Sequence, residues 1–278
     1  MVWLLGGILS GSLAKAATTP EDWYNEGNKQ LDAGKYDKAV ESYRKALAKR
    51  KKFAFAWFNL ALAYGRLGKR NDEIEAYKKA IESKKNYVKA MFNLAIAYED
   101  ANKPDEAVKT YQSVLAADPK SADAHINLGI LLARQQKFSE AIGHYDKALA
   151  INPKLADAWF NKGVALGRLN KLPDEIAAYK KCLEHDPKYH KAWYNLGVAY
   201  GRLSKSADEI DAYQKALKLK PAYPNALFNL AIALHRKDRK QAIETWERYI
   251  ALAKKLPKEQ ARWLPQAEKY LKELKSNK

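Results

Sequence analysis

Trp193-Tyr194-Asn195-Leu196-Gly197-Val198-Ala199-Tyr200 is the stretch that decides the fold, because close relatives of it recur at a fixed spacing through the 278-residue chain. The best marker is an asparagine that returns every 34 residues, at Asn25, Asn59, Asn93, Asn127, Asn161, Asn195 and Asn229. A tyrosine keeps the same step, at Tyr43, Tyr77, Tyr111, Tyr145, Tyr179 and Tyr213. A 34-residue period is the signature of a solenoid of helix-turn-helix units. The sequence therefore predicts seven tandem pairs of helices.

Each repeat carries two apolar stripes at helical spacing. With Pro20 as position 1, the repeats cover residues 20–53, 54–87, 88–121, 122–155, 156–189, 190–223 and 224–256, the last being one residue short. Positions 4, 7, 8 and 11 form one stripe and positions 21, 24, 27 and 28 form the other, so each helix has a face to bury. Position 8 is always Gly or Ala, which predicts that the two helices of a repeat approach closely. Thr19 before Pro20 predicts that the first helix begins there.

The repeats combine Trp at position 4, Leu-Gly at positions 7 and 8, Tyr at 11, Ala at 20, an aromatic residue at 24, Ala at 27 and Pro at 32. With these residues the chain resembles the tetratricopeptide repeat family from residue 20 to about residue 256. The resemblance implies an all-α fold, a right-handed superhelical solenoid of helix-turn-helix units with a concave groove. Residues 257–278 resemble the helix that covers the last repeat of such a stack. The alternative is that this amphipathic segment binds a membrane or a calmodulin-like partner. Its apolar residues are Trp263, Ala267, Tyr270, Leu271 and Leu274.

Positions 5, 6, 9 and 13 lie on the side of each first helix away from its buried stripe, and we call this side the asparagine face. The asparagine at position 6 stands between an apolar residue at position 5 and, in six repeats, an aliphatic residue at position 9. An amide offers the donor and the acceptor that the backbone of an extended peptide needs. The row is similar to the asparagine ladder of peptide-binding tetratricopeptide superhelices. The alternative is that each asparagine bonds only the neighbouring helix. The candidate peptide-binding residues are the seven asparagines together with Phe58, Phe92, Phe160, Tyr194, Phe228, Arg134 and Arg236.

Arginine occupies position 13 in five repeats, at Arg66, Arg134, Arg168, Arg202 and Arg236. Three of these repeats also carry Gly at position 12 and Glu at position 20, which predicts ion pairs within the repeat. The predicted pairs are Arg66 with Glu73, Arg168 with Glu175, and Arg202 with Glu209. Arg134 and Arg236 lack the glutamate, so these are the arginines expected to contact an acidic partner. Tyr24 and Asn93 stand where the carboxylate-clamp sub-family carries Lys and Arg, which argues against that clamp.

The sequence contains no recognisable catalytic constellation. The five histidines occupy unrelated repeat positions and none has metal-ligand spacing, so neither a metal site nor a cofactor site is expected. His125 replaces the tryptophan of position 4 and is expected to be packed. The single cysteine, Cys182, falls where other repeats carry Ala, so a small buried side chain is expected. The chain is therefore predicted not to be an enzyme.

The first residues have features of a secretory signal peptide. The apolar run from Val2 to Leu13 is too short to span a bilayer, and Ala14-Lys15-Ala16 has the small-x-small form of a cleavage site. No Lys or Arg precedes Lys15, which is unlike a typical signal peptide. We therefore expect residues 1–16 to be a signal peptide and the protein to be periplasmic or secreted, with a retained anchor or a cytoplasmic location as the alternatives.

The formal net charge of +18 favours acidic partners. The function expected is that of a non-enzymatic scaffold or adaptor that binds an extended peptide segment of a partner protein in a cell-envelope assembly. The alternative is binding of a polyanion, either nucleic acid or acidic glycan, by the basic surface. Nucleic acid is the less favoured partner because the aromatic residues fall at core or groove positions and are not interleaved with lysines on one face.

Overall fold

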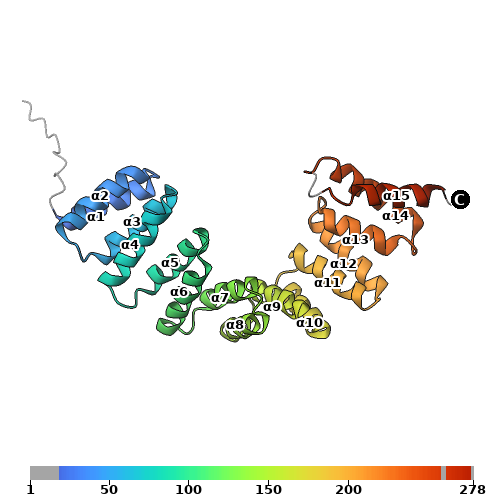
Figure 1. Cartoon of the computed structure of the whole chain (residues 1–278), viewed down its shortest axis with the longest axis horizontal. Helices are drawn as coiled ribbons and strands as arrows, with labels where there is room; N and C mark the ends of the chain where they lie inside the picture. Colours follow the sequence, from blue (N-terminus) through green and yellow to red (C-terminus); the bar gives the residue numbers. More distant parts are fainter. Residues whose placement is uncertain (1–18, 258–260, 277–278) are drawn as a thin grey trace, which may run out of the picture. The chain divides into compact units, whose positions relative to one another are not determined.

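The computed structural model describes residues 19–257 and 261–276, and all regular elements in these ranges are α-helices. Fourteen of them form seven consecutive pairs, and Figure 1 shows the two helices of each pair side by side. The helices are α1 Pro20–Asp32, α2 Tyr36–Lys49, α3 Ala54–Arg66, α4 Arg70–Ser83, α5 Val88–Asp100, α6 Pro104–Ala117, α7 Ala122–Arg134, α8 Phe138–Ile151, α9 Ala156–Arg168, α10 Leu172–His185, α11 His190–Arg202, α12 Ser206–Leu219, α13 Pro224–Leu234, α14 Arg239–Ala253 and α15 Leu264–Ser276. The prediction of an all-α chain of tandem helical pairs is confirmed.

Contacts divide the chain into two compact units, with the boundary after Pro119. The first unit contains α1 to α6 and the second contains α7 to α15. In both units each helix packs most closely on its neighbours in the chain, as the units of a solenoid do.

The first helix begins where the sequence predicts. Thr19 is its N-cap, and the Thr19 hydroxyl accepts a hydrogen bond from the N–H of Asp22 at 3.0 Å. The Asp22 carboxylate in turn accepts one from the N–H of Thr19 at 3.0 Å, which completes a capping box. Pro20 occupies the first helical position, where its missing N–H costs nothing.

The turn between the two helices of a repeat holds position 15 in the left-handed region of φ in the first six repeats. The residues are Gly34, Gly68, Asn102, Gln136, Asn170 and Ser204, with φ from 55° to 72°. The N–H of the next residue then bonds back across the helix end, as when Lys69 donates to the carbonyl of Tyr64 at 2.9 Å. This common turn ends the first helix of these six repeats at the same position, although its residue varies.

Small residues at position 8 bring the two helices of a repeat together, as predicted. In four repeats this residue is glycine, and a Cβ added to it would lie 2.5–2.6 Å from the ring of the tyrosine at position 24. These tyrosines are almost completely buried; Tyr179 is 2% exposed. The missing side chain therefore makes room for a ring that fills the centre of the repeat.

The core of the seventh repeat differs from the others because a tryptophan replaces the central tyrosine. Trp246 takes the place of the tyrosine, is completely buried, and lies 5.2 Å between ring centroids from Phe228. Helix α15 packs on α14 through the buried residues Ala267 and Leu274. The Arg239 guanidinium fixes the end of α15 by donating two hydrogen bonds to the carbonyl of Leu274 at 2.6 and 2.9 Å. Helix α15 thus covers part of the last repeat, as the resemblance implies.

The predicted signal peptide at residues 1–16 lies outside the described residues. Within the described ranges, each helix is too short or too polar to cross a bilayer.

Candidate functional site

Except for Arg236, the predicted site residues lie on the first helix of their repeats, and their exposures differ. Asn25, at the start of the chain's first helix, is exposed, whereas Asn59, Asn93, Asn127, Asn161, Asn195 and Asn229 are half-buried. Among the aromatic residues at position 5, Phe58 is 4% exposed and serves as core. Phe92, Phe160, Tyr194 and Phe228 are half-buried, so these rings belong partly to the core and partly to the surface.

Most asparagine amides for which bonds are described donate to the repeat before them. The Nδ2 of Asn195 donates to the Tyr179 hydroxyl at 3.2 Å, and the Nδ2 of Asn229 donates to the Tyr213 hydroxyl at 3.4 Å. In the first unit the Nδ2 of Asn59 donates to the Oδ1 of Asn28 at 2.8 Å. The alternative left open by the sequence, a bond to the neighbouring repeat, is therefore present. These bonds use the amide nitrogen, which has a second N–H, and each amide also has a carbonyl oxygen.

Asn161 differs from these asparagines. In the part of the chain that the structure describes, its amide makes no hydrogen bond to the preceding tyrosine, Tyr145. Its side chain instead lines a cavity of about 650 Å³ between α7, α8 and α9. The other lining residues are Ile130, Ala133, Arg134, Gln136, Phe138, Tyr145, Val164, Ala165 and Arg168. This cavity combines aliphatic walls with two guanidinium groups and two amides.

Two arginines of position 13, Arg134 and Arg168, line this cavity. Arg134 is the last residue of α7 and Arg168 is the last residue of α9, and both are exposed. The sequence prediction of Arg134 as a site residue agrees with this place, but it passed over Arg168. Arg236 is also exposed, yet it lies beyond the end of α13 at Leu234. The seventh repeat is one residue short, so Arg236 does not take the place that Arg134 and Arg168 hold.

Among the described residues, the predicted pairing of the position-13 arginine with the position-20 glutamate of its own repeat is wrong. Glu175 pairs with Arg202 of the following repeat, at 2.8 Å between Oε2 and Nη1, and not with Arg168. Glu73 pairs with Arg70 at 2.5 Å, and Arg70 also reaches Asp100 of the next repeat at 3.0 Å. Burial raises the pKa of Glu175, against the opposing effect of Arg202.

The coincidence of Gly at position 12 with Glu at position 20 has a steric origin. A Cβ added to Gly167 would lie 2.7 Å from the Oε1 of Glu175. The same distance separates an added Cβ on Gly65 from Glu73, and one on Gly201 from Glu209. Glycine therefore makes room for the carboxylate.

A double-mutant cycle checks which arginine forms the ion pair with Glu175. We expect Glu175→Gln and Arg202→Met each to lower the free energy of unfolding by about 1–2 kcal/mol, since a largely buried carboxylate loses its partner while Arg202 is partly exposed. The two changes together should cost less than their sum by about 1 kcal/mol, measured by urea unfolding. The matched cycle of Glu175→Gln with Arg168→Met should be additive. Coupling to Arg168 and additivity with Arg202 would contradict the pairing described here.

Burial is the main influence on His125, His144 and Cys182. His125 is 5% exposed, as expected, and its Nδ1 lies 3.0 Å from the Nδ1 of His144. Burial and the neighbouring His125 lower the pKa of His144 to about 4. Burial raises the pKa of the Cys182 thiol to about 12, which disfavours the reactive thiolate at neutral pH. The described residues contain no group of three or more His, Cys, Asp or Glu side chains arranged to hold a metal ion.

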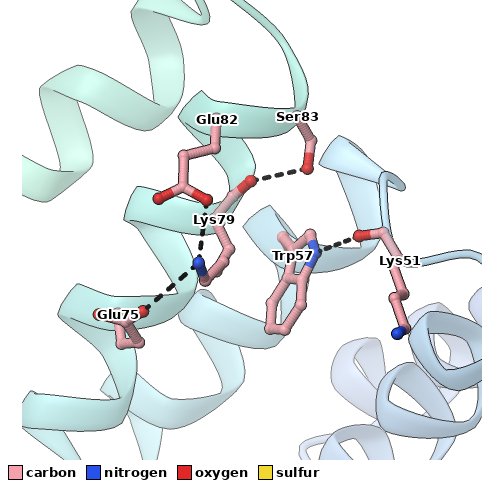
Figure 2. A network of polar contacts seen from close by, with 6 residues as sticks. All are labelled: Lys51, Trp57, Glu75, Lys79, Glu82 and Ser83. Carbon is pink, nitrogen blue, oxygen red and sulfur yellow. Dashed lines mark hydrogen bonds and ion pairs between the residues drawn. The ribbon is translucent and has the colours of Figure 1, made fainter.

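The tryptophans at position 4 and the lysines near them make contacts within the protein. Figure 2 shows the Trp57 indole N–H donating to the carbonyl of Lys51 at 2.8 Å. Beside it, the Lys79 ammonium lies 2.9 Å from Glu82 and 4.0 Å from Glu75. Trp159 and Trp193 make the same backbone bond, to Pro153 and Pro187. The Lys162 and Lys215 ammonium groups lie over the Trp159 and Trp193 rings, at 5.3 and 4.6 Å from the ring centroids, and Lys79 is paired with acids of its own helix.

Family comparisons match most of the described chain. Sequence models described as tetratricopeptide repeat match residues 56–87, 92–156, 144–177 and 178–211, and one described as TPR repeat matches residues 27–68 and 210–238. A curated relative, the TPR repeat-containing protein MJ1428 of Methanocaldococcus jannaschii, is 58% identical over 43 residues. That match covers 16% of this chain and only 8% of the relative.

Solved structures show the same fold. YrrB, described as a TPR protein with an unusual peptide-binding site, is 23% identical, with a TM-score of 0.59, over 68% of this chain and 97% of its own. The C-terminal part of a TPR repeat-containing protein from Cytophaga hutchinsonii is 15% identical, with a TM-score of 0.73, over 89% of this chain and 99% of its own. At these identities the likeness concerns the fold alone.

Proposed function

This chain belongs to the tetratricopeptide repeat family, and we propose that it is a non-enzymatic scaffold that binds an extended peptide segment of a partner protein along the asparagine face. Repeat proteins of this kind offer extended surfaces for partners. The asparagine face is suited to a peptide because it sets an amide beside apolar side chains in every repeat.

The observation that carries the proposal is the cavity at Asn161. Peptide recognition needs polar groups that are available beside apolar surface. At this place an amide without a described hydrogen bond lies with Ile130 and Val164 in a space of about 650 Å³, large enough for one or two peptide side chains. The description of YrrB as a peptide-binding protein of the same fold supports the proposal by analogy.

We further propose that the scaffold serves in the cell envelope. The support is the sequence alone, through the apolar run from Val2 to Leu13 and Ala14-Lys15-Ala16. Edman sequencing of the protein purified after expression tests this: a mature chain that begins at Ala17 supports export, and an intact Met1 in the cytosolic fraction contradicts it.

Binding is tested with a defined probe, a pool of random 10-residue peptides that are acetylated and amidated, passed over the immobilised full chain. We expect retention that changes little between 0.1 and 0.5 M NaCl, because amide and apolar contacts do not depend on counterion release. The variant Asn161→Ala with Asn195→Ala should retain at least fivefold less peptide.

Tyr179→Phe is the matched control for this variant. It removes the same internal hydrogen bond that Asn195→Ala removes, but it leaves both amides in place. Unchanged retention by Tyr179→Phe assigns the loss to the asparagines as ligand contacts. Retention that survives the asparagine changes, or that disappears in 0.5 M NaCl and is replaced by binding of heparin, would instead favour the polyanion function.

A further inference from the structure

The cavity between α7, α8 and α9 carries charge as well as amides. Its lining contains two guanidinium groups, from Arg134 and Arg168, and no carboxylate. A peptide side chain that enters it therefore meets cationic donors above aliphatic walls formed by Ile130 and Val164.

The Arg168 guanidinium is the cationic group of this cavity that is available to bind a ligand. The carboxylate that its repeat offers, Glu175, is bonded to Arg202 at 2.8 Å. Within the described ranges, Arg168 makes neither an ion pair nor a hydrogen bond through its side chain. Arg168 is exposed and lines the cavity, and its guanidinium carries five N–H donors. Arg134 has interactions of its own and only adds to the positive field.

Asn161 and Arg168 lie on the same face of α9. They are seven residues apart, or nearly two helical turns, so they lie on one face about 10 Å apart along the axis. Val164 lies between them on that face. A peptide whose backbone bonds the Asn161 amide would thus hold a neighbouring side chain within reach of the Arg168 guanidinium.

We infer that this cavity is a carboxylate subsite, in which Arg168 binds a carboxylate of the extended segment while Asn161 holds the segment's backbone. A guanidinium and a carboxylate match in geometry and can form two parallel hydrogen bonds. The net charge of +18 also favours the approach of an acidic segment. The inference rests on the proposed function, and it adds the chemical class of the partner.

Three peptide pools test the subsite with the full chain. Each is a random 10-residue pool: the first has Glu fixed at its centre and an amidated end, the second has Gln at its centre and an amidated end, and the third has Gln at its centre and a free C-terminal carboxylate. Because a guanidinium-carboxylate pair adds to backbone contacts, we expect the Glu pool to be retained at least threefold more than the amidated Gln pool in 0.15 M NaCl. Preferential retention of the third pool alone would show that the carboxylate is a chain terminus.

Arg168→Gln should remove the preference for Glu and leave retention of the amidated Gln pool unchanged. Lys240→Gln, which removes one charge at an exposed residue of α14, should keep the preference. Circular dichroism of both variants checks that they fold. Equal retention of the Glu and Gln pools by the unchanged protein, or loss of the preference in both variants, would overturn the subsite.

The outcomes separate the two proposals. If all pools are retained equally and the asparagine variant still lowers retention, the scaffold function stands and the carboxylate subsite fails. If no pool is retained, the peptide-binding function fails and the subsite fails with it.

Discussion

Replacing Tyr179 with alanine is expected to lower the free energy of unfolding by about 3–5 kcal/mol, the range found when a buried aromatic side chain is removed. The Tyr179 ring is 2% exposed and lies against the backbone of Gly163, where an added Cβ would approach it to 2.6 Å. No neighbouring side chain at Gly163 can fill the space, so a cavity remains. Urea unfolding followed by circular dichroism measures the loss.

Tyr179→Phe is the comparison that separates packing from hydrogen bonding. It keeps the ring and removes only the hydroxyl that accepts from Asn195, so the expected loss is about 1 kcal/mol. A loss below about 1 kcal/mol for the alanine variant would show that the repeat closes around the missing ring, and that the close approach of its helices does not depend on it.

Placing a charge in the interface between α14 and α15 is the second change with a large expected effect. Ala267 is completely buried where α15 packs on α14. The change Ala267→Asp would bury a carboxylate, and an uncompensated buried charge costs about 3 kcal/mol or more. Because α15 would loosen, the amides of α14 around Trp246 and Tyr249 should exchange with deuterium at least tenfold faster.

Lys272→Asp provides the control on the same helix. Lys272 is exposed, so the same new carboxylate should change the free energy of unfolding by no more than about 0.5 kcal/mol. If Ala267→Asp and Lys272→Asp had equal effects on exchange in α14, the idea that α15 solvates the last repeat through its buried face would be wrong.

Local chemistry and periodicity were sufficient to predict the helical pairs. The apolar stripes, the small residue at position 8 and the cap at Thr19 depend on residues close in sequence or on a strict repeat. The left-handed turn at position 15 was missed because its residue changes between Gly, Asn, Gln and Ser, so composition gives no constant signal there.

The site was less predictable than the fold, because its contacts cross from one repeat to the next. Glu175 occurs with Arg168 in one repeat, yet it bonds Arg202. In a periodic sequence the correct partner and its copy 34 residues away are the same residue type, so pattern alone does not choose between them. The cavity at Asn161 is likewise defined by three helices from two repeats. Only coordinates distinguish Asn161, whose amide faces this space, from Asn195, whose amide bonds Tyr179.

The bonds from Asn195 and Asn229 to the tyrosine of the repeat before them have a consequence for how the protein melts. Asn195 and Asn229 have their internal partners only while the preceding repeat is folded. The stability of a repeat protein is the sum of the stability of each repeat and of the interfaces between adjacent repeats. These bonds add to the interface terms and leave the stability of a single repeat unchanged. Strong nearest-neighbour coupling makes partly melted states rare. The three repeats that these bonds link, residues 156–256, should therefore melt cooperatively as a block, and shortening that block should lower its melting temperature.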